Sequence, residues 1–308
     1  MKKILFSLLA VATLIGCGKN DENGSDSANL LVKKITEKDE DGNLKEVITL
    51  TYQGGRPVSF SEANYENGVQ TGTTQVTTLY YEGRFIKQAK RVNAGRDNYV
   101  QNFTYENGKV ATKTEKHERN NYTTTYQYSY AGDQLTNVLK SRPTTIYVNG
   151  NVQSGTYYEE RQFTYRGNTV IEVTTQYEKD LNGAVVTDTS YGTNTITYTL
   201  SGGNVVKEVE ENSYSNYVEE YTYDTKSNPL HYITNFVDPD PTNFLEIDNG
   251  KNNILTYKNT REHNGTKNET LSIFEYTYNA NGYPTVVKQY KEKGNGAREF
   301  QGTKEYEY

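Results

Sequence analysis

The chain has 308 residues, of which 33% are hydrophobic, with 29 tyrosines, no tryptophan and one cysteine. Its formal net charge of −6 argues against nucleic acid and against an anionic lipid surface as electrostatic partners. Because a single cysteine cannot form an internal disulfide, packing and sheet hydrogen bonds must hold the fold together.

The amino terminus has the pattern of an export signal. Lys2-Lys3 precede an apolar run over residues 4–15, which is too short to span a bilayer comfortably. The run ends in Leu14-Ile15-Gly16-Cys17, which resembles a bacterial lipobox. We therefore predict a lipoprotein signal peptide over residues 1–16, with Cys17 as the lipidated first residue and outer-membrane lipid as its partner. A plain secretory signal with a chance cysteine is the alternative. Cleavage leaves 31 basic against 39 acidic residues, a net charge of −8.

Residues 17–29 are predicted to be a disordered polar tether, because they contain almost nothing that could be buried. The cluster Lys19-Asn-Asp-Glu22 resembles the charged export signal of surface lipoproteins in Bacteroidetes-type bacteria, with an ordinary acidic linker as the alternative. The triplet Asp26-Ser27-Ala28 resembles an O-glycosylation site of the same bacteria, which makes Ser27 a candidate acceptor. We expect an outer-membrane, lipid-anchored protein on the cell surface, or alternatively on the periplasmic face.

From Leu30 onward the apolar residues recur every second position. In Tyr126-Gln-Tyr128-Ser-Tyr130, every tyrosine points to one side of an extended chain. One face is aromatic and aliphatic and the other is rich in Thr, Ser, Gln and Glu, which is typical of half-buried antiparallel strands. Pairs such as Asn67-Gly68 and Asn107-Gly108 predict hairpin turns, since both residues tolerate positive φ. No window predicts an amphipathic helix.

A unit of an aromatic residue, one intervening residue and a tyrosine, followed by a turn, recurs along the chain, as in Phe103-Thr-Tyr105-Glu-Asn-Gly-Lys109. Each unit reads as one hairpin. We predict an all-β fold, a repetitive antiparallel β-hairpin meander that forms one large curved or barrel-like sheet of about 16–20 strands. It forms a single domain over residues 30–308. An insertion containing Asp238-Pro-Asp-Pro241 precedes a degenerate copy near Leu255-Thr-Tyr257.

The unit Phe-Thr-Tyr-x-Asn-Gly-Lys-Val resembles the tyrosine-aspartate (YD) repeat of Rhs-type and teneurin-type β-shell proteins. The chain also resembles Bacteroidetes lipoproteins of unknown function that carry such repeats and are sometimes described as porin-like in fold. The resemblance covers Leu30 to Tyr308 and implies no known activity. The Asp of the repeat's name is present here only at Tyr223-Asp224.

The search for chemical motifs is mostly negative. His117, His231 and His263 have no partner at zinc-ligand spacing, so no metal site and no cofactor are predicted. We place His231 on a strand and the other two in polar loops. Asp39-Glu-Asp41-Gly-Asn43 and Asp238-Pro-Asp240 have calcium-type oxygens, but the first is better read as a hairpin turn.

Paired carboxylates could still assemble from separate strands, as in glycosidases. The candidate doublets are Glu159-Glu160, Glu210-Glu211 and Glu219-Glu220. Since neighbouring residues of a strand point to opposite sides, each doublet supplies one carboxylate per face. A solvated charged outer face is the favoured interpretation.

The second tyrosines of the units are candidate binding-face aromatics, because exposed Tyr can stack on sugar rings. They are Tyr81, Tyr105, Tyr130, Tyr165, Tyr198, Tyr223 and Tyr278. Composition favours a core role, since few Leu and Ile are present. We expect Tyr105 and Tyr130 to share one face and to pack against Val110 and Leu135, with Thr104 pointing the other way.

The resulting functional hypothesis is a lipid-anchored cell-envelope protein without catalysis, which binds a glycan or an outer-membrane protein or acts as a scaffold. The alternatives are a carbohydrate-active enzyme with cross-strand carboxylates and a porin-like barrel that carries small molecules. An embedded barrel is disfavoured, because its lipid-facing band needs Leu, Val, Ile and Phe, and here the apolar face is mostly tyrosine.

Overall fold

The computed structural model describes residues 31–93, 98–120, 122–148, 150–186, 192–211, 216–263, 265–293 and 296–308, without the side chains of residues 232 and 235–237. The predicted signal peptide, Cys17, tether and Ser27 lie outside the described residues. The first strands are β1 (Lys34–Lys38), β2 (Leu44–Gln53), β3 (Arg56–Glu66), β4 (Val69–Glu82), β5 (Phe85–Asn93), β6 (Tyr99–Glu106), β7 (Lys109–His117), β8 (Thr123–Ala131), β9 (Gln134–Val148) and β10 (Asn151–Arg166). They are followed by β11 (Thr169–Asp180), β12 (Val185–Val186), β13 (Asn194–Ser201), β14 (Asn204–Glu211), β15 (Asn216–Ser227), the helix α1 (Pro229–Val237), the 3-10 turns η2 (Asn243–Leu245) and η3 (Ile247–Asn249), β16 (Asn252–His263), β17 (Thr266–Tyr278), β18 (Pro284–Glu292) and β19 (Arg298–Glu307).

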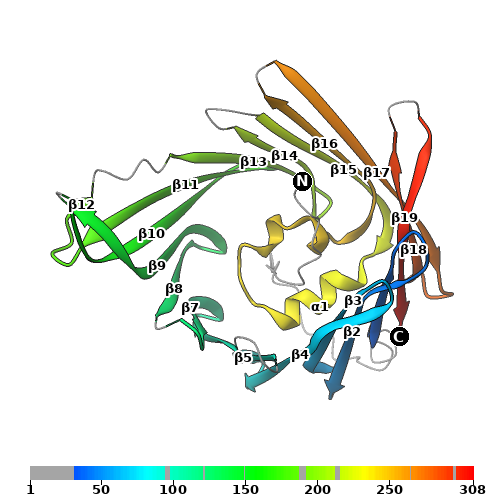
Figure 1. Ribbon diagram of the computed structural model, residues 1–308, viewed down its shortest axis with the longest axis horizontal. Coiled ribbons are helices and arrows are strands. Elements are labelled where there is room, and N and C mark those ends of the chain that lie inside the picture. Colours follow the sequence, from blue (N-terminus) through cyan, green and yellow to red (C-terminus); the bar gives the residue numbers. More distant parts are fainter. Residues whose placement is uncertain are drawn as a thin grey trace.

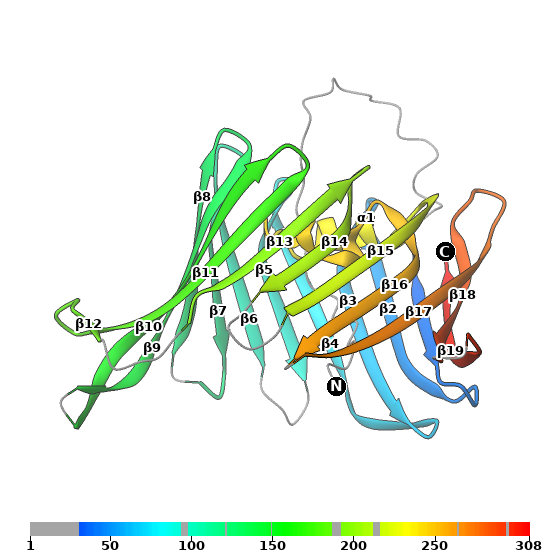
Figure 2. The same cartoon turned by 90° about the horizontal axis from the view of Figure 1, so that it is seen from above.

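The strands close into a barrel. Each strand from β1 to β11 and from β13 to β19 pairs antiparallel with its neighbour along the chain, and β19 pairs with β1 (Figures 1 and 2). These 18 strands form a closed ring, and the two-residue β12 adds to β11. The predicted all-β, barrel-like meander of hairpins is therefore confirmed.

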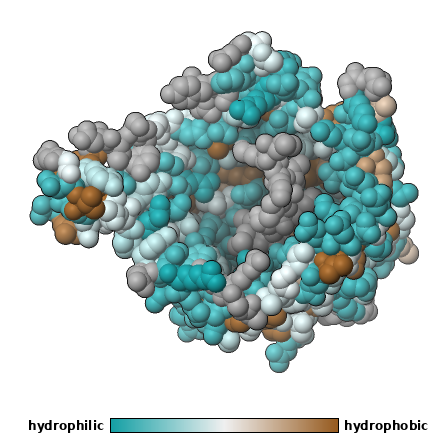
Figure 3. All heavy atoms as spheres, viewed as in Figure 1, coloured by the Kyte–Doolittle hydropathy of each residue, from teal (hydrophilic) through white to brown (hydrophobic). Residues whose placement is uncertain are grey.

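The apolar face of the sheet points into the barrel. On β6, Gln101 and Phe103 are buried, whereas Asn102 and Thr104 are exposed. Phe103 belongs to a buried cluster that also contains Ile233, which lies on the segment inside the barrel. The face of the molecule in Figure 3 is mostly hydrophilic. Exposed apolar residues of the described chain include Val69, Tyr147 and Leu181.

The predicted turns are present. Asn67 and Asn107 have φ of 52° and 51°, each followed by a glycine with positive φ, as a two-residue hairpin loop requires. The segment Asp39–Asn43 is a hairpin turn, in which the Asp39 carboxylate accepts hydrogen bonds from the main-chain nitrogens of Asp41 (3.1 Å) and Asn43 (2.8 Å).

The insertion forms a plug, which we define as residues 228–251. It leaves the wall after β15 and returns to it at β16, and α1, η2 and η3 lie within the ring of strands (Figures 1 and 2). Helix α1 corrects two predictions: that no window of the sequence forms an amphipathic helix, and that His231 is on a strand. Asn228 caps it by accepting from the Leu230 nitrogen (3.0 Å), and Pro229 begins it. Nine residues are too few for a clear period in the sequence. His117 and His263 end strands rather than lying in loops.

A tyrosine hydroxyl closes the gap between neighbouring hairpins. The ladder between β5 and β6 ends at Gln88 and Asn102, and beyond it the Tyr105 hydroxyl donates to the Ile86 carbonyl (2.9 Å). The same bond joins Tyr52 to Val32, Tyr81 to Pro57, Tyr130 to Val110, Tyr223 to Val205, Tyr276 to Ile254 and Tyr308 to Pro284. We call these seven contacts the tyrosine bonds.

The expected packing of the repeat is confirmed for two hairpins. Tyr105 pairs across the ladder with Val110, and Tyr130 pairs with Leu135, and all four residues belong to the luminal cluster or pack against it. Thr104 points outward and is exposed.

In the unit near residue 198, the position equivalent to Tyr105 is two residues later than the sequence predicted. Leu200, and not Tyr198, pairs with the first residues of the next strand, at Val205. Here the ladder between β11 and β13 reaches Thr169, and the Leu200 nitrogen donates to the Asn168 carbonyl (2.8 Å). The two strands therefore do not separate before the turn, and no carbonyl needs a tyrosine hydroxyl as its donor. An aliphatic residue can occupy the position of Leu200 for this reason.

We predict that Tyr105→Phe lowers the free energy of unfolding by about 1–2 kcal/mol, because the partly buried Ile86 carbonyl loses its donor. The matched control is Tyr80→Phe on the outer face, where the ring is 48% exposed; it should change stability by less than about 0.5 kcal/mol. Urea melts of the two variants and the parent measure both values. Equal effects would show that the tyrosine bond does not contribute.

Candidate functional site

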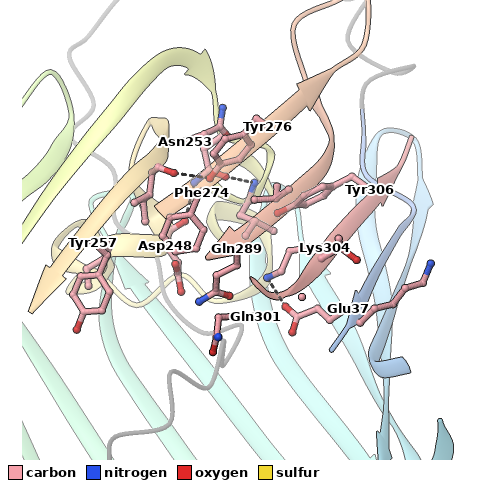
Figure 4. Close-up of a pocket in the computed structure, with 18 of the residues that line it drawn as sticks. Glu37, Asp248, Asn253, Tyr257, Phe274, Tyr276, Gln289, Gln301, Lys304 and Tyr306 are labelled. Atoms are coloured by element: carbon pink, nitrogen blue, oxygen red, sulfur yellow. Dashed lines mark hydrogen bonds and ion pairs between the residues drawn. The ribbon is translucent and has the colours of Figure 1, made fainter. Parts of the chain in front are cut away.

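A cavity of 170 Å³ lies between the plug and the wall formed by β15–β19 and β1 (Figure 4). Its aromatic lining consists of Tyr221, Tyr257, Phe274, Tyr276 and Tyr306. Its polar lining includes Glu37, Asp248, Asn253, Gln289, Gln301 and Lys304. The volume is below the roughly 300–1,000 Å³ of pockets for drug-sized ligands, so a small molecule would fill it.

The plug presents Asp248 to the cavity from η3. The Asn228 amide donates to the main-chain oxygens of Asp248 (2.8 Å) and Gly250 (3.0 Å), and the His231 Nδ1 lies 2.6 Å from the Asn249 carbonyl. A Cβ on Gly250 would lie 2.9 Å from the Asn204 Oδ1, so only glycine fits there without a shift. The hydrogen bonds hold η3 to the start of α1 within the plug, and the close approach of Gly250 to Asn204 sets η3 against the wall at β14.

The Asp248 carboxylate accepts no hydrogen bond from any described residue. Burial raises the pKa of this carboxyl above its usual range; the charge of Lys304 opposes that change and the charge of Glu37 adds to it. The Lys304 Nζ lies 2.5 Å from the Glu37 Oε1, so this ammonium is already paired. Asp248 is thus an acid inside the barrel with incomplete compensation.

The aromatic lining is held by its own hydroxyls. The rings of Tyr221 and Tyr257 are stacked with centroids 5.3 Å apart, and both hydroxyls donate to the Glu219 carboxylate, at 2.5 and 2.8 Å. The Tyr276 hydroxyl donates to the Ile254 carbonyl. Since these hydroxyls are engaged, what the wall offers a ligand is mainly ring surface.

A second polar cluster holds the plug against the opposite wall. The Lys113 ammonium lies 2.5 Å from an Asp240 oxygen and 3.3 Å from a Glu115 oxygen, and the Tyr128 hydroxyl donates to Asp240 (2.8 Å). Burial raises the pKa of Asp238 to about 6, with Lys113 opposing and Asp240 adding to the change. Asp240 of the Asp238-Pro-Asp240 motif therefore forms an ion pair with Lys113. Among the described residues, no group of three or more His, Cys, Asp or Glu side chains could hold a metal ion.

The candidate tyrosines all lie on the luminal side, but they do not line the cavity. Tyr81, Tyr105, Tyr130 and Tyr223 make tyrosine bonds, and Tyr198 is buried. Tyr165 stacks on Phe244 of the plug, and the Tyr278 hydroxyl donates to Asp224. The cavity uses aromatics two positions earlier in the units, such as Tyr221 and Tyr276.

The glutamate doublets divide between the two faces. Glu219 accepts from luminal tyrosines, whereas Glu220 is 3.7 Å from Lys207 in an exposed pair. Glu159 pairs with Lys140 and Glu160 accepts from Asn137. None of the three doublets lines the cavity. Sequence analysis missed Glu37, Asp248 and Lys304. The insertion was a signal for the segment that carries Asp248, and no pattern pointed to the two strand residues.

No family model and no curated protein matches the sequence. Among solved structures, the chain is similar to a porin-like protein from Bacteroides uniformis ATCC 8492, with a TM-score of 0.42 and 16% identity over 90% of this chain and 97% of that one. It is also similar to a porin-like protein from Bacteroides vulgatus ATCC 8482, with a TM-score of 0.42 and 13% identity over 90% of this chain and 98% of that one. No helix in the described part of the chain has the length and apolar character needed to cross a bilayer.

We predict that Asp238→Asn stabilises the protein more at about pH 7.5 than at about pH 4.5, by roughly 1–2 kcal/mol. The folded pKa of Asp238 is raised to about 6, above its unfolded value, so the native state binds the extra proton. Charged Asp238 therefore destabilises the fold above this pKa, and that cost disappears as the pH falls towards the unfolded value. Asparagine removes the cost while keeping an acceptor for the Asp240 nitrogen.

Urea melts at the two pH values test this prediction, with Asp41→Asn on an exposed turn as the control. A larger loss of stability at the higher pH would mean that the ionised form of Asp238 is needed to hold the plug.

Proposed function

We propose that this protein is a lipid-anchored, non-catalytic binding protein of the bacterial outer membrane, and that its luminal cavity takes a small polar ligand of the glycan class. The observation that carries the proposal is the Asp248 carboxylate, which faces the cavity without a hydrogen-bond donor from the described residues. An acid in this position is stabilised when a ligand supplies the missing donors.

The rest of the lining fits such a ligand. Ring faces of Tyr221, Tyr257 and Tyr276 can stack on the apolar face of a sugar, and the Gln289 amide can bond to its hydroxyls. Fixed aromatic platforms with a few convergent polar groups are typical of small-ligand sites.

The outer face supports anchoring by lipid. Outward positions such as Asn102 and Thr104 are polar, and a lipid-facing band would need apolar residues there. We assign the attachment to Cys17 and place the barrel on the cell surface. Ser27 in the tether is the proposed O-glycosylation site.

One observation favours a second candidate, a carbohydrate-active enzyme. The carboxyls of Glu37 and Asp248 face the same aromatic cavity, and two acids are what glycoside hydrolysis needs. The pairing of Glu37 with Lys304 favours binding instead, because it occupies one of the two acids. Release of reducing sugar from oligosaccharides, lost in Asp248→Asn, would establish the enzyme.

We predict that Cys17→Ser moves the protein from the membrane fraction to the soluble or unprocessed fraction, because the thiol that accepts lipid is gone. Fractionation after detergent-free lysis measures the change. A variant that still sediments with the outer membrane would show that the anchor is not the lipid, and an embedded barrel would then be the better hypothesis.

We predict that Gln289→Trp, which fills the cavity, weakens saccharide binding at least about tenfold. Ligand-observed NMR with glucose, galactose, N-acetylglucosamine and glucosamine provides the measurement. The matched control is Gln70→Trp, since Gln70 is exposed on β4; it should bind like the parent. If the parent binds none of the four sugars, or if both variants behave alike, the cavity is not a glycan site.

A further inference from the structure

Two of the three basic residues that line the cavity are paired with acids. Lys304 is paired with Glu37, and Lys38 lies 2.7 Å from Glu305. Lys45, the third basic residue of the lining, is exposed to bulk solvent. The inner part of the cavity therefore keeps one negative group without an ion-pair partner of its own among the described residues, the Asp248 carboxylate (Figure 4).

A neighbouring acid reports the charges on this wall. Glu46 lies directly across the β1–β2 ladder from Glu37. Burial, followed by the charges of Glu37 and Glu62, raises the pKa of Glu46 to about 7. The charges of Glu37 and Glu62 therefore act on this wall in the same sense as the charge of Asp248.

The aromatic wall suits a cation. Two stacked rings, Tyr221 and Tyr257, and the rings of Phe274 and Tyr276 line the same space. The face of an aromatic ring attracts an ammonium group, and the attraction grows when water is excluded. The Gln289 side chain, which makes no hydrogen bond to any described residue, supplies a neutral donor and acceptor for hydroxyls.

We propose that the ligand of this cavity carries a primary ammonium group that pairs with Asp248, on a small hydroxyl-bearing ring such as an amino sugar. This inference rests on the proposed function and names the ligand class for the same site. The ammonium supplies the hydrogen-bond donors that Asp248 lacks, the ring lies against the tyrosine faces, and Gln289 bonds to a hydroxyl.

The test is titration of the full-length protein by calorimetry with three probes. Glucosamine carries both features, glucose has a hydroxyl in place of the amine, and cyclohexylamine has the amine without hydroxyls. We expect glucosamine to bind at least about tenfold more tightly than glucose, since a charge-assisted bond replaces a neutral one. Asp248→Asn should abolish that preference. The matched control is Asp238→Asn, another buried luminal acid, which lies outside the cavity lining and should keep the preference.

The outcomes separate this inference from the proposed function. Equal binding of glucose and glucosamine, or a preference that survives Asp248→Asn, overturns the ammonium site while leaving a glycan site standing. Binding of cyclohexylamine as tight as that of glucosamine supports the ammonium contact and overturns the glycan class. Failure of both amines to bind overturns the inference, and it does so from the parent protein alone, even where Asp248→Asn does not fold.

Discussion

The bond between a tyrosine hydroxyl and the main-chain carbonyl of the preceding strand is the interaction on which this barrel depends. Neighbouring strands of different hairpins separate before they reach the turns, as the ladder between β7 and β8 does after Thr112 and Gln127. The carbonyl of Val110 would then lack a donor, and a partly buried polar group without a partner is costly. The Tyr130 hydroxyl fills the gap, and its ring packs against the luminal cluster. Phenylalanine could supply the packing but not the bond, which accounts for tyrosine at the positions that make tyrosine bonds.

The parts of the fold that the sequence predicts are those encoded by neighbouring residues. Alternation on β6 and the positive φ of Asn107 depend on a few adjacent positions, so strands, hairpins and faces could be predicted. Closure depends on the pairing of Ile35 with Tyr306, at opposite ends of the chain, and no local pattern encodes it. The repeat period also gave Tyr198 a position that Leu200 occupies. Whether Tyr or Leu stands there depends on how far the ladder between β11 and β13 extends, which the period does not encode.

The candidate site was beyond the reach of the sequence for a related reason. Glu37 comes from β1, Asp248 from η3 and Lys304 from β19, so the group exists only once the barrel has closed around the plug. The insertion was visible as an interruption of the repeat, and Asn228-Pro229 is a recognisable helix start. What the sequence could not show is that the inserted segment turns inward, since Leu230 and Ile233 would suit the packing of a surface loop equally well.

A ring of 18 strands encloses more space than its own side chains can fill, so the plug supplies both apolar and polar groups to the interior. On one side Lys113 is shared by Asp240 and Glu115, and only Asp238 beside them carries a cost when it is charged. On the other side Asp248 is not matched, although replacing it with an uncharged residue would relieve the cost of its burial. Structural stability alone does not account for an ionisable group in that position, and the ligand that we propose would account for it. The two sides of the plug thus differ in role: one attaches it to the wall, and the other presents a charge to the cavity.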